Sequence, residues 1–342
     1  MDLLDIIYPQ DRDLCDFYTF GSRADITIST LSEPPRSLVS PNLFIPPLSS
    51  DDGNLMTGQR ERAILIPSSL TMESRDSRVN TLKVGQIARA AAVFQFNRIV
   101  IYRDPEHDDS RFISMVLRYM ETPQYLRKML IPRREELRHV GMLPPLRTAH
   151  HPTNSKSESL KIGEFRVGAV VESVGSDSGV WVEIGINRPI PLRTKEKIPV
   201  GQRLNVRIFS QEPLAAEPVD RKEIPHYWGY ETEIVDSLEA YLASRQDALV
   251  LLTSVRGKAV TPELLQKLGQ SGRKQGLAVV FGSPARGLDA FLRSEAIGRY
   301  EMINTILHQG TETVRVEEAV FATLALLNLG AFGGLNGNNT PT

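Results

Sequence analysis

The sequence INTILHQGT at positions 303–311 runs from an apolar strand directly into a loop of small and polar residues. Two earlier stretches repeat this design, LLTSVRG at 251–257 and VFGSPARG at 280–287. In an open α/β sheet, ligands bind beyond the carboxyl ends of the strands. Glycine in such loops lets backbone amides and carbonyls approach a flat ligand closely. The three stretches together therefore predict a ligand pocket, built largely from backbone, at one edge of a parallel sheet.

Polar side chains in these stretches could recognise the polar edges of a nucleoside, because hydroxyl and amide groups form directional hydrogen bonds. They are Thr253, Ser254, Asn304, Gln309 and Thr311. Walker and G-x-G-x-x-G motifs are absent, which argues against an ATPase or a dinucleotide-dependent dehydrogenase. G-x-S-x-G and H-E-x-x-H are absent too, so neither a hydrolase nor a zinc enzyme is supported.

The cysteines and histidines of the chain give little support for a metal site. A single cysteine, Cys15, excludes a disulfide framework and a thiolate metal cluster. His150 and His151 precede Pro152 in a polar stretch with no third ligand nearby, so we expect a surface pair and no metal site. No apolar run approaches the roughly 20 residues of a membrane span, and the N-terminus lacks the basic start of a signal peptide. We therefore expect a cytoplasmic protein.

Strands and helices alternate upstream of the pocket-forming stretches. We expect strands at 62–67 and 98–102 and helices at 79–94 and 109–120. In the first helix, apolar residues recur at i, i+3, i+4 and i+7, at Val84, Ile87, Ala88 and Ala91. This β-α-β-α order predicts a parallel sheet with helices on its faces. After residue 225 the same texture returns, with helices expected at 234–244, 262–268 and 288–293, strands at 248–252, 277–281 and 300–303, and a last helix from Val316 that Gly330 caps.

Short strands of alternating polarity interrupt this pattern between residues 159 and 212. They are expected at 164–174, 179–186, 188–193 and 202–210. They fit a small β-barrel of the oligonucleotide-binding (OB) kind or, equally, another small antiparallel insertion. A proline-rich linker (Pro213, Pro218, Pro225) follows. The α/β domain would thus comprise residues 59–158 and 213–329, with the barrel at 159–212 inserted into it.

The first 58 residues differ from the rest of the chain. They hold nine acidic and three basic side chains, a net charge of −6, which leaves +5 for the remainder. They contain prolines and polar runs without a sustained hydrophobic period, so we expect a flexible acidic extension. Residues 330–342, rich in glycine and asparagine, are expected to be a disordered tail. The mildly basic remainder permits a polyanionic partner without requiring one.

Four segments carry a resemblance to a known family: GQIARA at 85–90, TSVRG at 253–257, AVVFG at 278–282, and 304–319 with its QGTETVRVEEA run. The chain resembles the SPOUT class of RNA methyltransferases, in particular the archaeal and eukaryotic family with an inserted β-barrel, over residues 62–329. The resemblance implies an α/β fold with a parallel sheet, in which the C-terminal segment threads through an earlier loop as a trefoil knot. It also implies an OB-like barrel, a homodimer, and S-adenosylmethionine as cofactor. The chain departs from the family at Ile306-Leu307, where Cys-Pro is expected, and at Glu312, where Arg is usual.

The resemblance and the loops together assign candidate residues to each role. The cofactor-binding candidates are Thr253, Ser254, Arg256, Gly257, Gly282, Ser283, Asn304, Gln309, Gly310 and Thr311. A guanidinium could stabilise a deprotonated base, and the catalytic candidates are Arg89 and Arg256, followed by Arg75 and Arg78. For Arg89, a salt-bridged residue on a helix surface is an equally good interpretation.

RNA would be held by exposed cations and by aromatic side chains that stack on bases. The cationic candidates are Arg127, Lys128, Arg133, Arg134 and Arg138, and the aromatic ones are Trp181, Phe165 and Phe209. The expected function is methylation of an RNA base, with N3 of a ribosomal uridine favoured over a 2′-hydroxyl. The rival hypothesis is an RNA-binding scaffold that has kept the fold and lost catalysis, which the changes at Ile306-Leu307 and Glu312 would favour.

Overall fold

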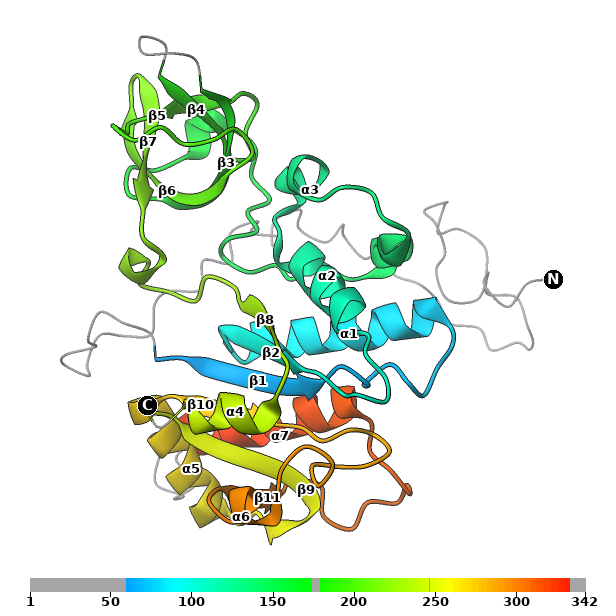
Figure 1. Cartoon of the computed structure of the whole chain (residues 1–342). Coiled ribbons are helices and arrows are strands. Elements are labelled where there is room, and N and C mark those ends of the chain that lie inside the picture. Colours follow the sequence, from blue (N-terminus) through cyan, green and yellow to red (C-terminus); the bar gives the residue numbers. More distant parts are fainter. Residues whose placement is uncertain (1–59, 174–178, 246, 333–342) are drawn as a thin grey trace, which may run out of the picture. The chain divides into compact units, whose positions relative to one another are not determined.

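A six-stranded sheet forms the centre of the protein (Figure 1). The computed structural model describes residues 60–173, 179–245 and 247–332. The strands lie in the order β11-β9-β10-β1-β2-β8, and every neighbouring pair is parallel, which confirms the predicted parallel sheet. They are β1 (Arg62–Pro67), β2 (Arg98–Tyr102), β8 (Glu231–Val235), β9 (Leu249–Ala259), β10 (Leu277–Val280) and β11 (Glu301–Asn304).

Both faces of this sheet are buried. Ile64 and Ile66 of β1 belong to one hydrophobic core, whereas Ala63 and Leu65 belong to another, because successive side chains of a strand point to opposite faces. Four helices cover the first core: α1 (Ser77–Val93), α2 (Ser110–Glu121), α5 (Pro262–Gln275) and α7 (Val316–Phe332). Two shorter helices pack on the second core: α4 (Leu238–Ala243) and α6 (Ser294–Ile297). Helix α3 (Gln124–Leu130) follows α2, and there are 3₁₀ turns at Glu135–Leu137, Val140–Met142, Ser157–Ser159 and Arg221–Glu223.

Helices α5 and α7 cross with their backbones in close contact. A Cβ atom on Gly330 would collide with the backbone of Leu265, and one on Gly269 would meet the backbone of Gly330 and Ala331. The expectation that Gly330 ends the last helix is therefore wrong, since α7 continues through it to Phe332. Of the expected disordered tail, residues 330–332 are helical, and residues 333–342 lie outside the described part of the chain.

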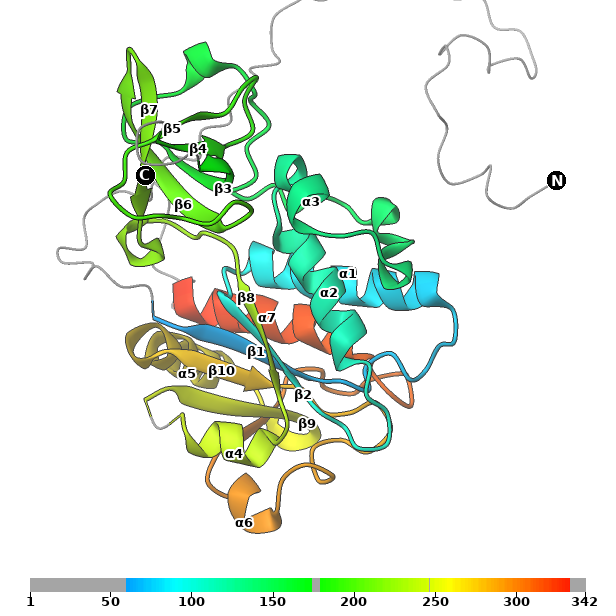
Figure 2. The ribbon, with the colours of Figure 1, turned by 45° about the horizontal axis from the view of Figure 1, so that its top comes forward.

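A closed five-stranded barrel interrupts the α/β domain (Figure 2). Its order is β3-β4-β5-β7-β6, and apolar residues of its strands fill the interior. The strands are β3 (Phe165–Ser173), β4 (Val180–Glu183), β5 (Ile190–Leu192), β6 (Arg203–Gln211) and β7 (Leu214–Val219). Strand β7 lies within the stretch expected as a linker, so the barrel continues past residue 212. It pairs with β5 in parallel, which makes the barrel mixed where an antiparallel one was expected.

Two further elements differ from the expected pattern. The helix expected at 234–244 begins only at Leu238, and Glu231–Val235 forms edge strand β8 beside β2. The side chains of an edge strand are largely exposed, so its polar sequence carried little strand signal. No helix forms at 288–293; the short helix α6 follows there instead. The predicted acidic extension at 1–58 lies outside the described residues, and no helix among those described is long and apolar enough to cross a membrane.

Candidate functional site

A cavity of about 230 Å³ lies at the carboxyl ends of β9, β10 and β11, where the three pocket-forming stretches meet. Six of the ten predicted cofactor residues line it: Thr253, Ser254, Gly282, Ser283, Asn304 and Gln309. Of the other four, Arg256, Gly310 and Thr311 adjoin a lining residue in the chain, and Gly257 lies two residues beyond Val255. The segment before α7 and the first half of that helix supply a further wall, which was not predicted although it directly follows Thr311. Its residues are Glu312, Thr313, Val314, Val316, Ala319 and Thr323.

The first stretch takes a different form from the one expected. Residues 253–257 continue strand β9, which pairs with β11 through a register shift between Met302 and Ile303. A Cβ atom on Gly257 would collide with the backbone of Ile303 and Asn304, and one on Gly282 would come within 2.8 Å of the Gly287 carbonyl carbon. These two glycines therefore allow backbone segments to cross one another. At Gly310, in contrast, a Cβ atom would meet nothing within 4 Å.

The polar side chains of the cavity mostly brace its loops. Thr253 donates to the carbonyl of Val280 at 2.8 Å, and Asn304 donates to Val255 at 3.0 Å while accepting from the amide of Ile306. Gln309 donates to the carbonyls of Thr311 and Glu312, each at 3.0 Å. These hydrogen bonds hold the loops of the cavity in place, and contact of the same side chains with a ligand stays a prediction.

The electrostatics of the cavity are simple. Among the described residues that line it, Glu312 is the only one with a charged side chain, and most of the others are apolar or hydroxyl-bearing. A phosphate-bearing ligand needs cations or a helix N-terminus lined with amides. A cavity with one carboxylate and no lysine or arginine instead suits a neutral or positively charged nucleoside derivative.

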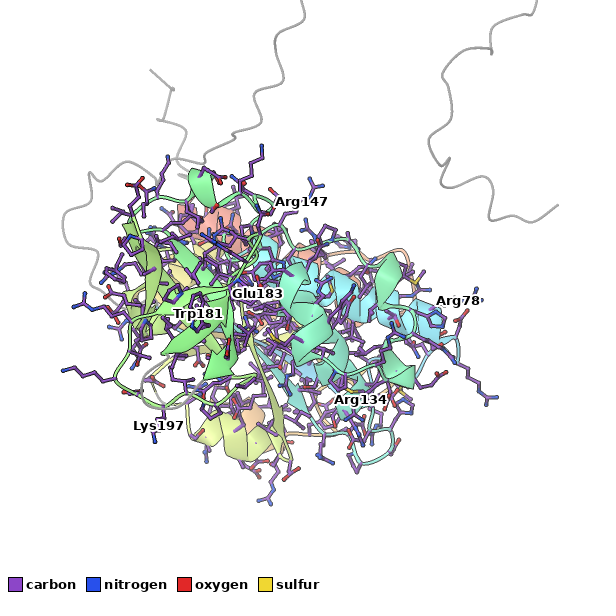
Figure 3. The ribbon with its side chains drawn as sticks, turned by 90° about the horizontal axis from the view of Figure 1, so that it is seen from above. Arg78, Arg134, Arg147, Trp181, Glu183 and Lys197 are labelled. Carbon is purple, nitrogen blue, oxygen red and sulfur yellow. The ribbon has the colours of Figure 1, made fainter. Side chains whose placement is uncertain are left out.

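None of the predicted catalytic arginines lines the cavity. Arg256 is 67% exposed at its side chain and forms an ion pair with Asp289. Arg89 lies on α1 and donates to the carbonyls of Pro145 and Leu146 at 3.2 and 2.8 Å. Arg78 pairs with Asp76 at the start of α1, at the surface of the molecule (Figure 3), and Arg75 is exposed. Their catalytic roles stay predictions.

The predicted RNA-binding cations differ in how many contacts they make with other residues of the protein. Lys128, Arg133 and Arg134 are exposed, and Figure 3 shows Arg134 at the surface. Arg127 lies over the ring of Tyr119, with 4.4 Å from its guanidinium carbon to the ring centre, and donates to Thr122. Arg138 forms an ion pair with Glu135 and donates to Ser77.

The predicted stacking aromatics lie on the barrel. Trp181 is half-buried on β4, and Figure 3 shows it on the face of the barrel seen from above. Phe165 packs edge-on to Trp228, with 6.3 Å between ring centres, and Phe209 lies beneath Arg193. Their roles as stacking platforms for bases stay predictions.

Of the histidine pair expected at the surface, one residue is in fact inside the protein and the other is half-buried. His150 is fully buried, and both rings contact the carbonyl of Glu121, at 3.2 Å for His150 and 2.8 Å for His151. Burial, followed by the charge of His150, lowers the pKa of His151 to about 4, so this ring is neutral at pH 7. No cluster of His, Cys, Asp or Glu in the described ranges could hold a metal ion. The pair packs against the end of α2, beside the joint between α2 and the barrel.

The parallel sheet, the cavity at its carboxyl edge and the closed barrel define an α/β protein with an inserted barrel module. Residues 61–327 match the family model described as "Putative RNA methyltransferase". This match spans most of the chain, and the chain therefore belongs to this RNA methyltransferase family. The resemblance drawn from the four sequence segments is confirmed.

Curated relatives agree with this family. An uncharacterised protein of Haloarcula marismortui is 38% identical over 285 residues, which cover 78% of this chain and 98% of that protein. The 28S rRNA (uridine-N(3))-methyltransferases of Mus musculus and Homo sapiens are each 29% identical over 304 residues. These alignments cover 78% of this chain and 76% and 78% of the mouse and human proteins.

Proposed function

We propose that this protein transfers the methyl group of S-adenosylmethionine to a base of ribosomal RNA, with N3 of a uridine as the acceptor. The proposal rests above all on the carboxyl-edge cavity within a chain of this RNA methyltransferase family. The mouse and human relatives are named as uridine-N(3)-methyltransferases, which supports N3 of uridine over a 2′-hydroxyl.

The cavity fits the cofactor on electrostatic grounds. S-adenosylmethionine carries a positive sulfonium and no phosphate, and Glu312 is the single charged side chain among the described lining residues. The volume of about 230 Å³ is below the roughly 300 Å³ at which pockets for drug-sized ligands begin. We infer that the nucleoside part fills the cavity and that the sulfonium end projects toward its mouth, where an acceptor base can reach it.

When bound, the cofactor supplies a methyl group already activated by its positive sulfur. The protein's task is therefore alignment, together with stabilising the uracil once N3 has lost its proton. We propose that Arg256, which directly follows lining residues of the cavity in the chain, stabilises the deprotonated uracil. Its present partner Asp289 is itself half exposed, so exchanging that surface ion pair for an anionic base costs little. Arg89 is the alternative.

We further propose that the chain forms a homodimer through α1 and α7, and that α7 belongs to a trefoil knot, as the family class implies. Helix α7 is mostly apolar, with Glu317, Glu318, Thr323 and Asn328 as its polar residues, and its Leu329 and Phe332 are 47% and 54% exposed. On α1, Val79, Leu82 and Val93 are exposed as well. Exposed apolar side chains gathered on neighbouring helices are typical of a protein–protein interface. The five-stranded closed barrel supports an OB-like RNA-binding module.

A cavity-filling variant tests this proposal by isothermal titration calorimetry with S-adenosylmethionine. Ala319 lines the cavity from α7, so Ala319→Phe places a ring inside it. We expect sub-millimolar binding to the wild-type chain and no measurable binding to Ala319→Phe. Ala240→Phe, at an exposed position of α4, is the matched control and should bind as the wild type does. Absence of cofactor binding in the wild type would favour the scaffold hypothesis. Equal binding to Ala319→Phe would show that the pocket lies elsewhere.

A further inference from the structure

A second and larger cavity, of about 1010 Å³, lies away from the cofactor pocket. One wall is the face of α2 that presents Arg111, Ser114, Met115 and Arg118. The opposite wall is the start of barrel strand β6, at Arg203, Leu204 and Asn205. Edge strand β8 and the segment after α3, which includes Arg134, complete the lining. We call this cavity the α2–barrel groove.

The charge of the groove is strongly one-sided. Five arginines and two glutamates line it. Arg203 is paired with Glu121, and Arg221 lies 3.7 Å from Glu231, so these four charges balance. The other three arginines, Arg111, Arg118 and Arg134, are exposed and have no ion-pair partner in the described part of the chain. Three uncompensated guanidinium groups in one groove favour a ligand with several negative charges.

The walls of the groove are held in place before any ligand binds. Glu121, almost fully buried at the end of α2, accepts hydrogen bonds from both terminal nitrogens of Arg203. On the barrel side, the indole of Trp228 donates to Asn205 at 2.8 Å. Tyr125, in the helix after α2, donates to the carbonyl of Val167 in the barrel at 2.7 Å. These hydrogen bonds therefore fix the position of the two walls of the groove.

Arg111, in the first turn of α2 and at one end of the groove, lies at the same edge of the sheet as the cofactor pocket. Helix α2 begins beside the carboxyl ends of β1 and β2, where the amide of Asp109 donates to Ser68 at 3.3 Å. Arg286, from the loop after β10 that also forms the cofactor pocket, pairs with Asp104 at the same edge. The other end of α2 meets the barrel through Glu121. Arg111 and Arg118 are seven residues apart, about 10 Å along the helix axis, and point to the same side.

We propose that the α2–barrel groove binds a single-stranded segment of the RNA substrate, with Arg111, Arg118 and Arg134 on its phosphates. The volume of about 1010 Å³ lies at the upper limit of the roughly 300–1,000 Å³ of small-molecule pockets, which leaves room for a short run of unpaired nucleotides. Specific recognition of RNA mostly targets unpaired segments. This inference rests on the proposed function, and it adds Arg111 and Arg118 to the basic residues expected from the sequence.

The test measures binding of a fluorescein-labelled oligouridine of about 12 nucleotides by anisotropy, at several KCl concentrations, with the full chain. The variant is the double substitution Arg111→Gln and Arg118→Gln. The control is Lys267→Gln with Lys274→Gln, which removes two exposed cations at the same seven-residue spacing from α5. Each phosphate contact to single strands contributes about 0.7 to the slope of log affinity against log salt. The variant should therefore lose about 1.4 of slope and bind about 25-fold more weakly at 0.1 M salt.

Three results would contradict the proposal that the α2–barrel groove binds single-stranded RNA. The first is unchanged affinity and slope in the arginine variant. The second is an equal loss in the lysine control, which would indicate a diffuse charge effect. The third is tighter binding of a duplex of the same length, or of oligoglutamate, which would indicate a different ligand. Calorimetry with S-adenosylmethionine on the same proteins keeps this inference separate from the proposed function. We expect cofactor affinity to be unchanged in both double variants, whatever the outcome with RNA.

Discussion

The joint between α2 and the barrel rests on one buried carboxylate, and replacing Glu121 by Gln is the sharpest test of its role. Glu121 accepts from Arg203 at 2.8 Å, and His150 lies 3.4 Å away. Burial alone would raise the pKa of Glu121. The hydrogen bonds from His150 and Arg203 and the charge of Arg203 outweigh burial and lower that pKa from 4.5 to about 2. Glutamine keeps the volume of the side chain and removes its charge.

The size and the sign of the effect follow from this shift. A pKa lowered by about 2.5 units is worth about 3 kcal/mol of folding stability at pH 7. Because the folded-state pKa is the lower one, this stabilisation is complete above pH 4.5 and is lost as the pH falls toward 2. At pH 3, roughly 1 kcal/mol remains. Glu121→Gln should therefore be about 3 kcal/mol less stable than wild type at pH 7 and about 1 kcal/mol less stable at pH 3.

Guanidinium denaturation of both proteins at the two pH values measures these differences. Glu217→Gln is the control, because Glu217 pairs with Arg207 on the barrel surface, where an ion pair is worth at most about 1 kcal/mol. A deficit of the same size at both pH values would mean that Glu121→Gln acts through packing. No deficit at either pH would refute the view that this ion pair joins α2 to the barrel.

Two more predictions concern the cofactor pocket and the dimer. Glu312→Gln should weaken binding of S-adenosylmethionine about fivefold, roughly 1 kcal/mol of Coulomb attraction. Binding of S-adenosylhomocysteine, whose sulfur is uncharged, should stay unchanged in calorimetry; equal losses for both ligands would contradict an effect on the sulfonium. Leu329→Asp should halve the mass found by analytical ultracentrifugation, because it places a charge on the exposed apolar face of α7, whereas Val200→Asp on the barrel should not; a wild-type chain that sediments as a monomer would refute the dimer.

The sequence revealed the sheet and the pocket because their signals are local. Buried strands such as β1 and β2 are continuous apolar runs, and residues at the carboxyl ends of parallel strands must converge once the strand order is right. The strand order itself, with β10 between β9 and β1, depends on long-range pairing that no local pattern encodes. Edge strand β8 and barrel strand β7 were missed because one is polar and the other contains a proline, Pro218.

The reasons for individual residues were harder to predict. The contact of Gly257 and Gly282 with a ligand stays a prediction. The structure shows a further role for both glycines, which let backbone segments cross, and a sequence does not distinguish these two uses of glycine. His150 and His151 were expected at the surface, because neither Glu121 nor Trp228, which contact His150, is near them in the chain. Arg111 and Arg118 had a visible signal, a seven-residue spacing on one helix. The spacing indicates a binding site only once the structure shows that the barrel forms the opposite wall of the groove.

Nucleoside mass spectrometry gives the most direct test of the claim that this chain methylates a base of ribosomal RNA. Purified protein is incubated with unmodified ribosomal RNA and S-adenosylmethionine carrying an isotopically labelled methyl group, and the RNA is then digested to nucleosides. We predict that the label appears in 3-methyluridine with the wild type and not with Ala319→Phe. Label confined to 2′-O-methylated nucleosides would contradict the assigned acceptor atom, and no label in any nucleoside would contradict the proposed activity itself.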